Sequence, residues 1–154
     1  MHINPDHYLE TPTGRVLTPE RNAMAWRQCF VDLAQALRAR EKPSRLYVLV
    51  GAQGAGKSTW AANQKLADPG CVIFDAILVK RSERKPILDE AVHSGIPAVG
   101  VWFQTPLRLC LQRNACRPAD QIADERGLRN VFAALEPPAI EEGFSSVLVV
   151  LDAA

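Results

Sequence analysis

The sequence predicts an α/β fold in which a parallel sheet is covered by helices on both faces. Short, almost continuously apolar runs alternate with helix-like segments, and the 154 residues are 47% hydrophobic and 23% charged. Apolar runs without polar alternation are typical of strands buried on both faces, which occur in parallel sheets. This length and composition suit one domain with its own core, and no repeat or linker divides the chain. We therefore expect a single domain over 1–154.

The first 41 residues are expected to form an arm and one added helix. Residues 1–17 are predicted to be an irregular arm with turn chemistry at 11–14. This arm either closes over the functional site or pairs with a second chain. Thr18 is a typical N-cap with Pro19 at the first helical position, which starts a helix over 18–41. Large apolar residues recur in it at helical spacing, which predicts one face packed on the core.

The rest of the chain is predicted to alternate strands with helices. The apolar runs that predict strands are 46–50, 71–74, 97–103 and 147–151. The segments that predict helices are 57–66, 82–94 and 125–135, with Ser82 as the cap of the second. A further helix is expected to be capped by Thr105 and to run toward 113–117.

A glycine-rich motif follows the first of these strands. Residues 51–58 read Gly-Ala-Gln-Gly-Ala-Gly-Lys-Ser, with a strand before them and a helix after them. This is the pattern of a phosphate-binding P-loop in its strand–loop–helix context. Glycine lets the backbone approach an anion with several N–H groups, and the helix N-terminus adds its dipole. The sequence therefore predicts a three-layer P-loop NTPase fold with about four strands and a nucleotide-binding core over 46–151.

The P-loop predicts which residues bind a nucleoside triphosphate and Mg²⁺. Lys57 carries a flexible positive charge suited to the β- and γ-phosphates, and the Ser58 hydroxyl is a usual ligand of Mg²⁺ in this loop. The residues expected to bind the nucleotide are Gly51, Ala52, Gln53, Gly54, Ala55, Gly56, Lys57, Ser58, Thr59 and Arg113.

Three further residues are candidates for catalysis beside Lys57. Asp75 follows an apolar strand, at the end where ligands bind in open parallel sheets, and its carboxylate can hold Mg²⁺ or accept a proton. Arg113 and Arg117 lie one turn apart on a predicted helix, where they can neutralise the charge of a transferring phosphoryl group. The alternatives are an aspartate that only caps a turn and a solvated basic helix end.

These motifs resemble the small P-loop kinases related to the kinase domain of polynucleotide kinases. The similarity covers roughly 46–151 and is carried by Gly51–Trp60, Asp75, Arg84, Val101–Leu107, Arg113-Asn114 with Arg117, and Pro138 with Glu142–Phe144. The resemblance implies ATP as the phosphoryl donor and a lid whose arginines, here Arg113 and Arg117, contact the nucleotide phosphates. It also implies that 138–144 lies near the adenine.

The chain departs from this family on the acceptor side. The family usually has another strand and helix before the strand that ends at the matched acid. That insert carries the expected general base and an arginine that reads the acceptor. Here only a short segment separates Trp60 from Cys71, and Ala76-Ile77-Leu78 stands where the family often has Asn-Thr-Asn. The departure implies that Asp75 serves as both magnesium anchor and base, or that transfer activity is lost.

A basic cluster is the candidate binding site for an acceptor. Lys80, Arg81, Arg84 and Lys85 surround the start of the helix predicted over 82–94, where positive charge opposes the helix dipole. The cluster either receives an anionic or hydroxyl-bearing acceptor near Arg81 and Arg84 or is an ordinary solvated face. Since the net charge is only +1, a nucleic-acid acceptor would depend on this local patch.

Other patterns favour a cytoplasmic protein without a structural metal site. The chain has four cysteines, none of them in a Cys-x-x-Cys pair, which indicates free thiols in a reducing compartment. No secretory signal or membrane-length apolar run is visible, so no membrane association is expected. The sequence does not indicate an oligomeric state.

The functional prediction is an ATP-dependent phosphotransferase that moves the γ-phosphate to a hydroxyl, on a nucleic-acid 5′ end or a small metabolite. The alternative is a nucleotide-binding module or weak ATPase without a dedicated acceptor, which the missing insert favours. A GTPase switch is disfavoured because the chain has no Asn-Lys-x-Asp segment to read guanine.

Overall fold

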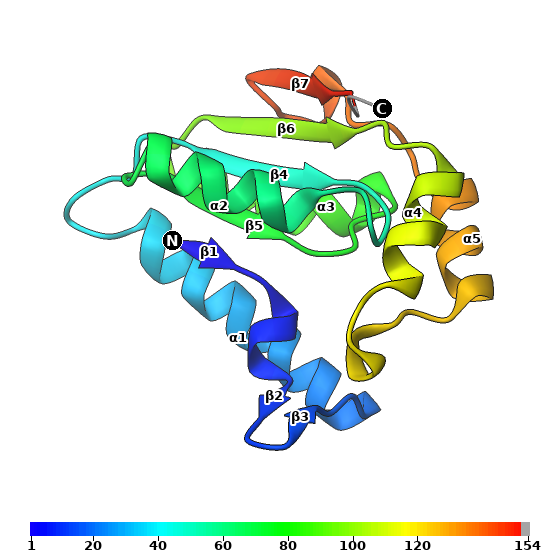
Figure 1. Cartoon of the computed structure of the whole chain (residues 1–154). Coiled ribbons are helices and arrows are strands. Elements are labelled where there is room, and N and C mark those ends of the chain that lie inside the picture. The colour runs from blue at the N-terminus through cyan, green and yellow to red at the C-terminus, as the bar shows by residue number, and fades with distance from the viewer. Residues whose placement is uncertain (152–154) are drawn as a thin grey trace.

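A five-stranded parallel sheet forms the centre of the computed structural model, which describes residues 1–151 (Figure 1). Its strands pair in the order β1-β5-β4-β6-β7. Their bounds are β1 His2–Ile3, β4 Leu46–Val50, β5 Val72–Asp75, β6 Ala98–Phe103 and β7 Ser146–Val150. A separate antiparallel hairpin joins β2 Glu10–Thr11 to β3 Gly14–Arg15.

Helices cover both faces of the sheet, so the molecule has three layers (Figure 1). One face carries α1 Pro19–Leu37 and α3 Arg81–Ser94. The other carries α2 Lys57–Ala67, α4 Leu107–Ala115 and α5 Glu125–Ala134. Short 3-10 turns are η1 Pro5–Tyr8, η2 Ala119–Gln121 and η3 Ile140–Glu142. No helix within residues 1–151 is long and apolar enough to cross a bilayer.

The buried strands explain the predicted fold class. All five residues of β4 are buried, and successive side chains alternate between the two faces. Leu46 and Val48 join the core cluster under α1 and α3, whereas Tyr47 and Leu49 join the cluster under α2, α4 and α5. A strand of this kind needs apolar residues at every position, and the three-layer P-loop fold expected from the sequence is therefore confirmed.

The N-terminal arm differs from the irregular segment that the sequence predicts. All four expected strands are present, and β1 adds a fifth by pairing in parallel with β5. The Ile3 side chain is 3% exposed and belongs to the core. A two-residue strand is too short to show a hydrophobic period, so only its pairing partner reveals it.

Two predicted helix caps are wrong, although the helices exist. The cap of α3 is Lys80 rather than Ser82, and the cap of α4 is Pro106 rather than Thr105. The Thr105 hydroxyl instead donates to a distant carbonyl oxygen. Thr18 does cap α1, since its side chain accepts a hydrogen bond from Arg21 N. That helix ends at Leu37, before the predicted end at residue 41.

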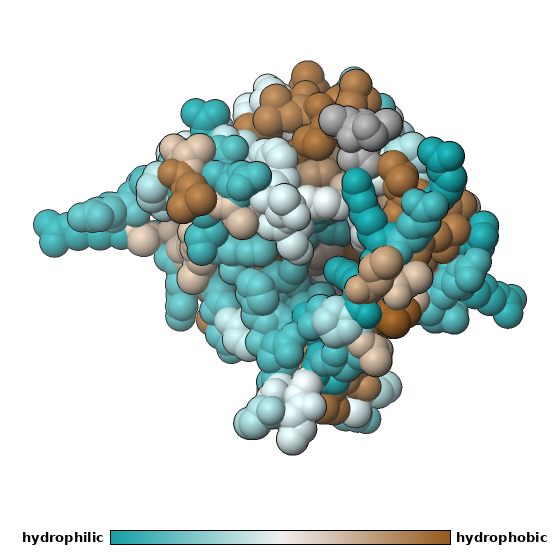
Figure 2. Space-filling view, in the orientation of Figure 1, coloured by the Kyte–Doolittle hydropathy of each residue, from teal (hydrophilic) through white to brown (hydrophobic). Residues whose placement is uncertain are grey.

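One edge of the sheet remains exposed. Figure 2 shows an apolar patch at the top of the molecule, over the edge strand β7. Leu148 and Val149 of this strand are exposed, and exposed apolar edge strands are uncommon in natural sheets.

A buried ion pair joins α3 to the segment before β7. Arg84 is fully buried, and its Nε and Nη2 donate to Glu142 Oε1 and Oε2 at 2.8 and 3.0 Å. Arg84 Nη1 also donates to the carbonyl oxygen of Leu78 at 3.0 Å, and Ala139 N donates to Glu142 Oε2 at 2.9 Å. Every charge in this pair therefore has hydrogen-bond partners, as a buried ion pair requires.

We predict that Arg84→Ala destabilises the fold strongly. The substitution leaves the Glu142 carboxylate buried without its partner, which should lower the free energy of unfolding by about 3–5 kcal/mol. Urea denaturation at neutral pH measures this free energy of unfolding. The neighbouring Lys85 pairs with Asp89 in solvent, so Lys85→Ala should cost less than about 1 kcal/mol. Equal losses for the two variants would contradict a stabilising role for the buried pair.

Candidate functional site

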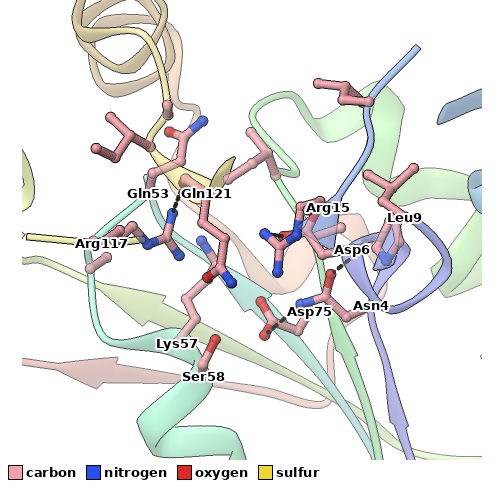
Figure 3. Close-up of a pocket in the computed structure, with 18 of the residues that line it drawn as sticks. Asn4, Asp6, Leu9, Arg15, Gln53, Lys57, Ser58, Asp75, Arg117 and Gln121 are labelled. Carbon is pink, nitrogen blue, oxygen red and sulfur yellow. Dashed lines mark hydrogen bonds and ion pairs between the residues drawn. The ribbon is translucent and has the colours of Figure 1, made fainter. Parts of the chain in front are cut away.

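A cavity of about 480 Å³ lies where β4 and β5 end (Figure 3). One wall comes from the P-loop, through residues 53–59, and the floor from residues 75–77 after β5. Residues from α4 and the following segment, 113–123, contribute a second wall, and the N-terminal arm with α1 contributes a third. Ligands of open parallel sheets bind at this end of the strands.

Two glycines of the P-loop have conformations that other residues rarely adopt. Gly54 has φ +78° and Gly56 has φ +97°, both in the left-handed region. A Cβ on Gly54 would lie 2.6 Å from the carbonyl oxygen of Cys110 in α4, so the loop packs too closely there for any side chain. Gly56 is the N-cap of α2, which directs the helix N-terminus at the cavity.

The Lys57 side chain lies folded against its own loop. Its Nζ donates to the carbonyl oxygens of Gly51 and Ala52 at 2.9 and 3.1 Å. These two residues therefore support the lysine, whereas the P-loop residues from Gln53 to Thr59 line the cavity. Burial lowers the pKa of Lys57 from its ordinary value of 10.5, and the nearby Asp75 carboxylate opposes this shift. An anion that replaces the two carbonyl groups would favour the charged lysine.

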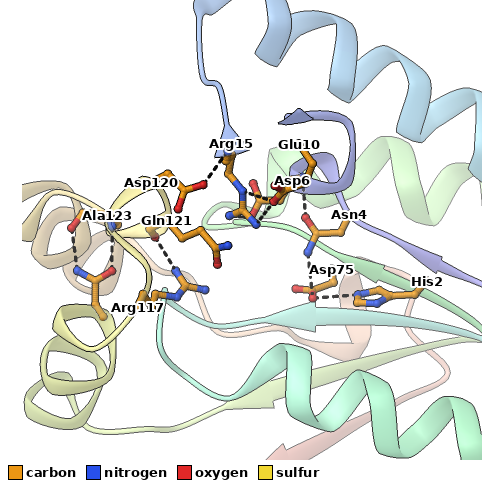
Figure 4. Close-up of polar contacts among 11 residues, drawn as sticks. His2, Asn4, Asp6, Glu10, Arg15, Asp75, Arg117, Asp120, Gln121 and Ala123 are labelled. Atoms are coloured by element: carbon orange, nitrogen blue, oxygen red, sulfur yellow. Dashed lines mark hydrogen bonds and ion pairs between the residues drawn. The ribbon is translucent and has the colours of Figure 1, made fainter. Parts of the chain in front are cut away.

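Asp75 is buried, with 1% of its surface exposed, at the end of β5. His2 Nε2 lies 3.0 Å from Asp75 Oδ2, and Asn4 Nδ2 donates to the same oxygen at 3.3 Å (Figure 4). Both contacts meet the same oxygen and fix the orientation of the carboxylate. The other oxygen, Oδ1, has no protein partner among residues 1–151.

The two predicted arginines reach the cavity from α4 and its C-terminal end. Arg113 Nη1 donates to the carbonyl oxygen of Gly54 at 3.3 Å, which links it to the P-loop. Arg117 Nη1 donates to the carbonyl oxygen of Gln121 at 3.4 Å. The buried Asn114 between them exchanges two hydrogen bonds with the backbone of Ala123, at 2.7 and 2.9 Å, and so holds the segment after α4 in place.

The structure brings most of the predicted site residues together. Lys57, Ser58, Asp75, Arg113 and Arg117 all line the same cavity, although their individual roles remain predictions. Figure 3 shows Lys57, Ser58 and Asp75 directed into one space. Hydroxyl and carboxylate oxygens are ligands that Mg²⁺ prefers, so Ser58 and Asp75 fit a magnesium site beside the phosphates.

The predicted acceptor patch lies elsewhere. Arg84 is fully buried and paired with Glu142, so its guanidinium is not accessible to an acceptor. Arg81 is half exposed and lies 3.8 Å from Glu142, and neither arginine lines the cavity. The segment 138–144, expected near the adenine, does not line this cavity either. Its Phe144 packs on Gly100 in the core under α1 and α3.

The arm supplies site residues that the sequence did not identify. His2 and Asn4 contact Asp75, while Asp6 and Arg15 form an ion pair at 3.2 Å on the third wall (Figure 4). His2, Asn4 and Asp6 alternate with apolar residues, but the alternating stretch is too short to predict a strand. The sequence predicts a capping role for Thr105, yet its hydroxyl donates to the P-loop carbonyl of Ala55 at 2.9 Å.

Comparison with known protein families agrees with this geometry. Residues 62–138, half of the chain, match the family described as an AAA domain. The chain belongs to this family. The matched part of this AAA-domain protein includes Asp75, Arg113 and Arg117, and the P-loop lies just before it. The protein is thus a P-loop nucleotide-binding domain of kinase-like type. No curated protein matches the chain.

We predict that Gly54→Ala weakens nucleotide binding. A Cβ would clash with Cys110 and force the loop out of its left-handed conformation, at a strain of about 1–3 kcal/mol. The affinity for Mg-ATP, measured by calorimetry, should therefore fall by about tenfold or more. Gly70→Ala is the control, because a Cβ there makes only an ordinary contact of 3.6 Å with Asp68. An unchanged affinity in Gly54→Ala would contradict the proposed phosphate cradle.

We also predict that ATP binding takes up a proton at Lys57 in alkaline solution. The free protein has a lowered pKa at Lys57, and bound phosphates raise it. Between these two pKa values the free lysine is neutral and the bound one charged, so affinity falls as pH rises through this window. Calorimetry in two buffers with different ionisation enthalpies should detect up to about one proton per ATP. Equal proton uptake by Lys57→Met would refute this assignment.

Proposed function

We propose that this AAA-domain protein is an ATP-dependent phosphotransferase that moves the γ-phosphate to a hydroxyl group. The observation that carries the proposal is the single cavity onto which Lys57, Asp75 and Arg117 converge. A phosphoryl transfer site needs positive charge around the phosphates, a metal-holding carboxylate and space for a second reactant. The cavity offers all three, since it extends from the P-loop to the N-terminal arm.

Each residue has a role that follows from its position. Lys57 neutralises the β- and γ-phosphates, and the backbone N–H groups of the P-loop hold their oxygens. Ser58 and Asp75 would hold Mg²⁺, which would further neutralise the phosphates. Arg113 and Arg117 stabilise the charge that develops on the γ-phosphoryl oxygens as the bond from the γ-phosphorus to ADP breaks. The hydroxyl oxygen of the acceptor attacks the γ-phosphorus from the opposite side.

The alternative function is a nucleotide-binding module or weak ATPase without a dedicated acceptor. The missing insert of the polynucleotide-kinase-like family favours it. The wall built by the arm and α1 supports the transferase function instead, because it faces the phosphate loop and leaves room for a second reactant.

The decisive experiment follows labelled γ-phosphate from ATP to acceptors. Wild-type protein should transfer label to a hydroxyl acceptor, and Lys57→Ala should lower kcat by about 100-fold or more. Lys65→Ala on the exposed end of α2 is the control and should keep wild-type activity. Binding of ATP without transfer above the Lys57→Ala background would favour the alternative function. A wild-type protein with no affinity for ATP would refute both functions.

A further inference from the structure

The wall of the cavity across from the P-loop comes from the first residues of the chain and from α1 (Figure 3). We call it the acceptor wall, and its polar and apolar side chains include Asn4, Asp6, Leu9, Arg15, Asn22 and Trp26. This segment borders the space beside the P-loop in which a second reactant would lie. Its chemistry therefore decides which acceptor fits beside the γ-phosphate.

The acceptor wall is anchored to the rest of the fold. β1 pairs with β5, so that Ile3 lies opposite Phe74, and Leu9 is only 2% exposed. The Tyr8 hydroxyl donates to Asp32 on α1. Arg21 of α1 donates through Nε to the carbonyl oxygen of Val16 at 3.0 Å. These contacts make the wall part of the folded domain, which suits a binding surface with fixed geometry.

The far end of this wall touches the segment after α4. Arg15 N donates to Asp120 Oδ2 at 2.6 Å (Figure 4). The contact joins the β2–β3 hairpin to η2, the short turn that follows the predicted lid arginines. The hairpin and the segment after α4 therefore meet at this rim of the cavity. We expect a compact acceptor to fit between the hairpin and the P-loop.

The charges of the acceptor wall disfavour an acceptor that carries phosphate. Its only cation, within the part of the chain that the structure describes, is Arg15. The Arg15 guanidinium lies 3.2 Å from Asp6 and 2.7 Å from Glu10, so two carboxylates neutralise it. Phosphate groups of an acceptor need unpaired arginine or lysine side chains, and this wall offers none. The half-buried Trp26 and the Asn22 amide suit instead the apolar face and hydroxyl groups of a sugar or nucleoside.

The two carboxylates of the cavity differ in their surroundings. Asp75 is buried and accepts hydrogen bonds from His2 and Asn4, which suits a fixed metal ligand. The Asp6 side chain is 46% exposed, and among residues 1–151 its carboxylate has one partner, Arg15. Asn4 connects the two acids, since its Oδ1 accepts from Asp6 N at 2.9 Å while its Nδ2 donates to Asp75. Asp6 is thus the carboxylate that is accessible to accept a proton from an acceptor hydroxyl.

We propose that the acceptor wall binds a small polyhydroxylated molecule without phosphate, of sugar or nucleoside type, and that Asp6 accepts the proton of its reacting hydroxyl. The inference rests on the phosphotransferase function proposed above. In the step, the acceptor oxygen forms a bond to the γ-phosphorus, and the bond from this phosphorus to the bridging oxygen of ADP breaks. The hydroxyl proton passes to a carboxylate oxygen of Asp6. Asp75 then acts only as a metal ligand.

The acceptor class is tested with matched acceptors that carry the same hydroxyl. Transfer of labelled γ-phosphate is compared between thymidine and a 5′-hydroxyl oligothymidylate, with glucose and glucosamine as further small acceptors. At least one small acceptor should react about tenfold faster than the oligonucleotide. Faster transfer to the oligonucleotide would overturn the inference and leave the phosphotransferase function intact. If the protein binds and hydrolyses ATP but transfers label to no small acceptor, the inference is also overturned. If the protein does not bind ATP, the proposed function itself is rejected.

The role of Asp6 is tested with Asp6→Asn against Glu10→Gln. Both residues pair with Arg15 and are half exposed, but only Asp6 lines the cavity. Asp6→Asn should lower kcat by about 100-fold, for the best acceptor and for hydrolysis by water, with an unchanged KM for ATP. Glu10→Gln should stay within about twofold of wild type. Asp6→Glu should recover part of the lost kcat, and melting curves check that each variant is folded. Equal kcat in Asp6→Asn and Glu10→Gln would overturn the inference.

Discussion

The functional site depends on the parallel register of three neighbouring strands. β4 and β5 pair so that Leu49 lies opposite Asp75, which brings the start of the P-loop and the buried acid to the same edge of the sheet. β1 pairs with β5 so that Ile3 lies opposite Phe74, and the arm therefore leaves the sheet beside that acid. Because parallel strands all end in the same direction, three segments far apart in the sequence meet around one cavity.

The cavity has two halves with different electrostatics. On the P-loop side, Lys57, Arg113 and Arg117 gather positive charge beside a helix N-terminus, as a polyphosphate requires. On the opposite side, the positive charge of Arg15 is neutralised by carboxylates, and polar amides alternate with apolar groups. This asymmetry distinguishes a cationic side of the cavity, next to the P-loop, from a side whose one arginine is neutralised.

Local patterns predicted the elements whose signals lie within a short stretch of chain. The glycines and lysine of the P-loop occur within eight residues, and the four apolar strands are continuous runs. Patterns failed where the partner of a residue is distant. Arg84 looks like part of a basic surface in the sequence, yet Glu142 pairs with it in the core. Thr105 has the features of a helix cap, but its hydroxyl bonds to the P-loop instead.

The sequence by itself determined the fold class, the phosphate-binding loop and the acid at the end of a strand, because each depends on residue types at short, regular spacing. Only the tertiary structure decided what the N-terminal arm does. Its strand pairs with β5, and this pairing places Asn4 and Asp6 beside the cavity. Contacts between residues about 70 positions apart leave no pattern in a short stretch of sequence. Only the folded structure therefore shows that the first residues of the chain form a wall of the site.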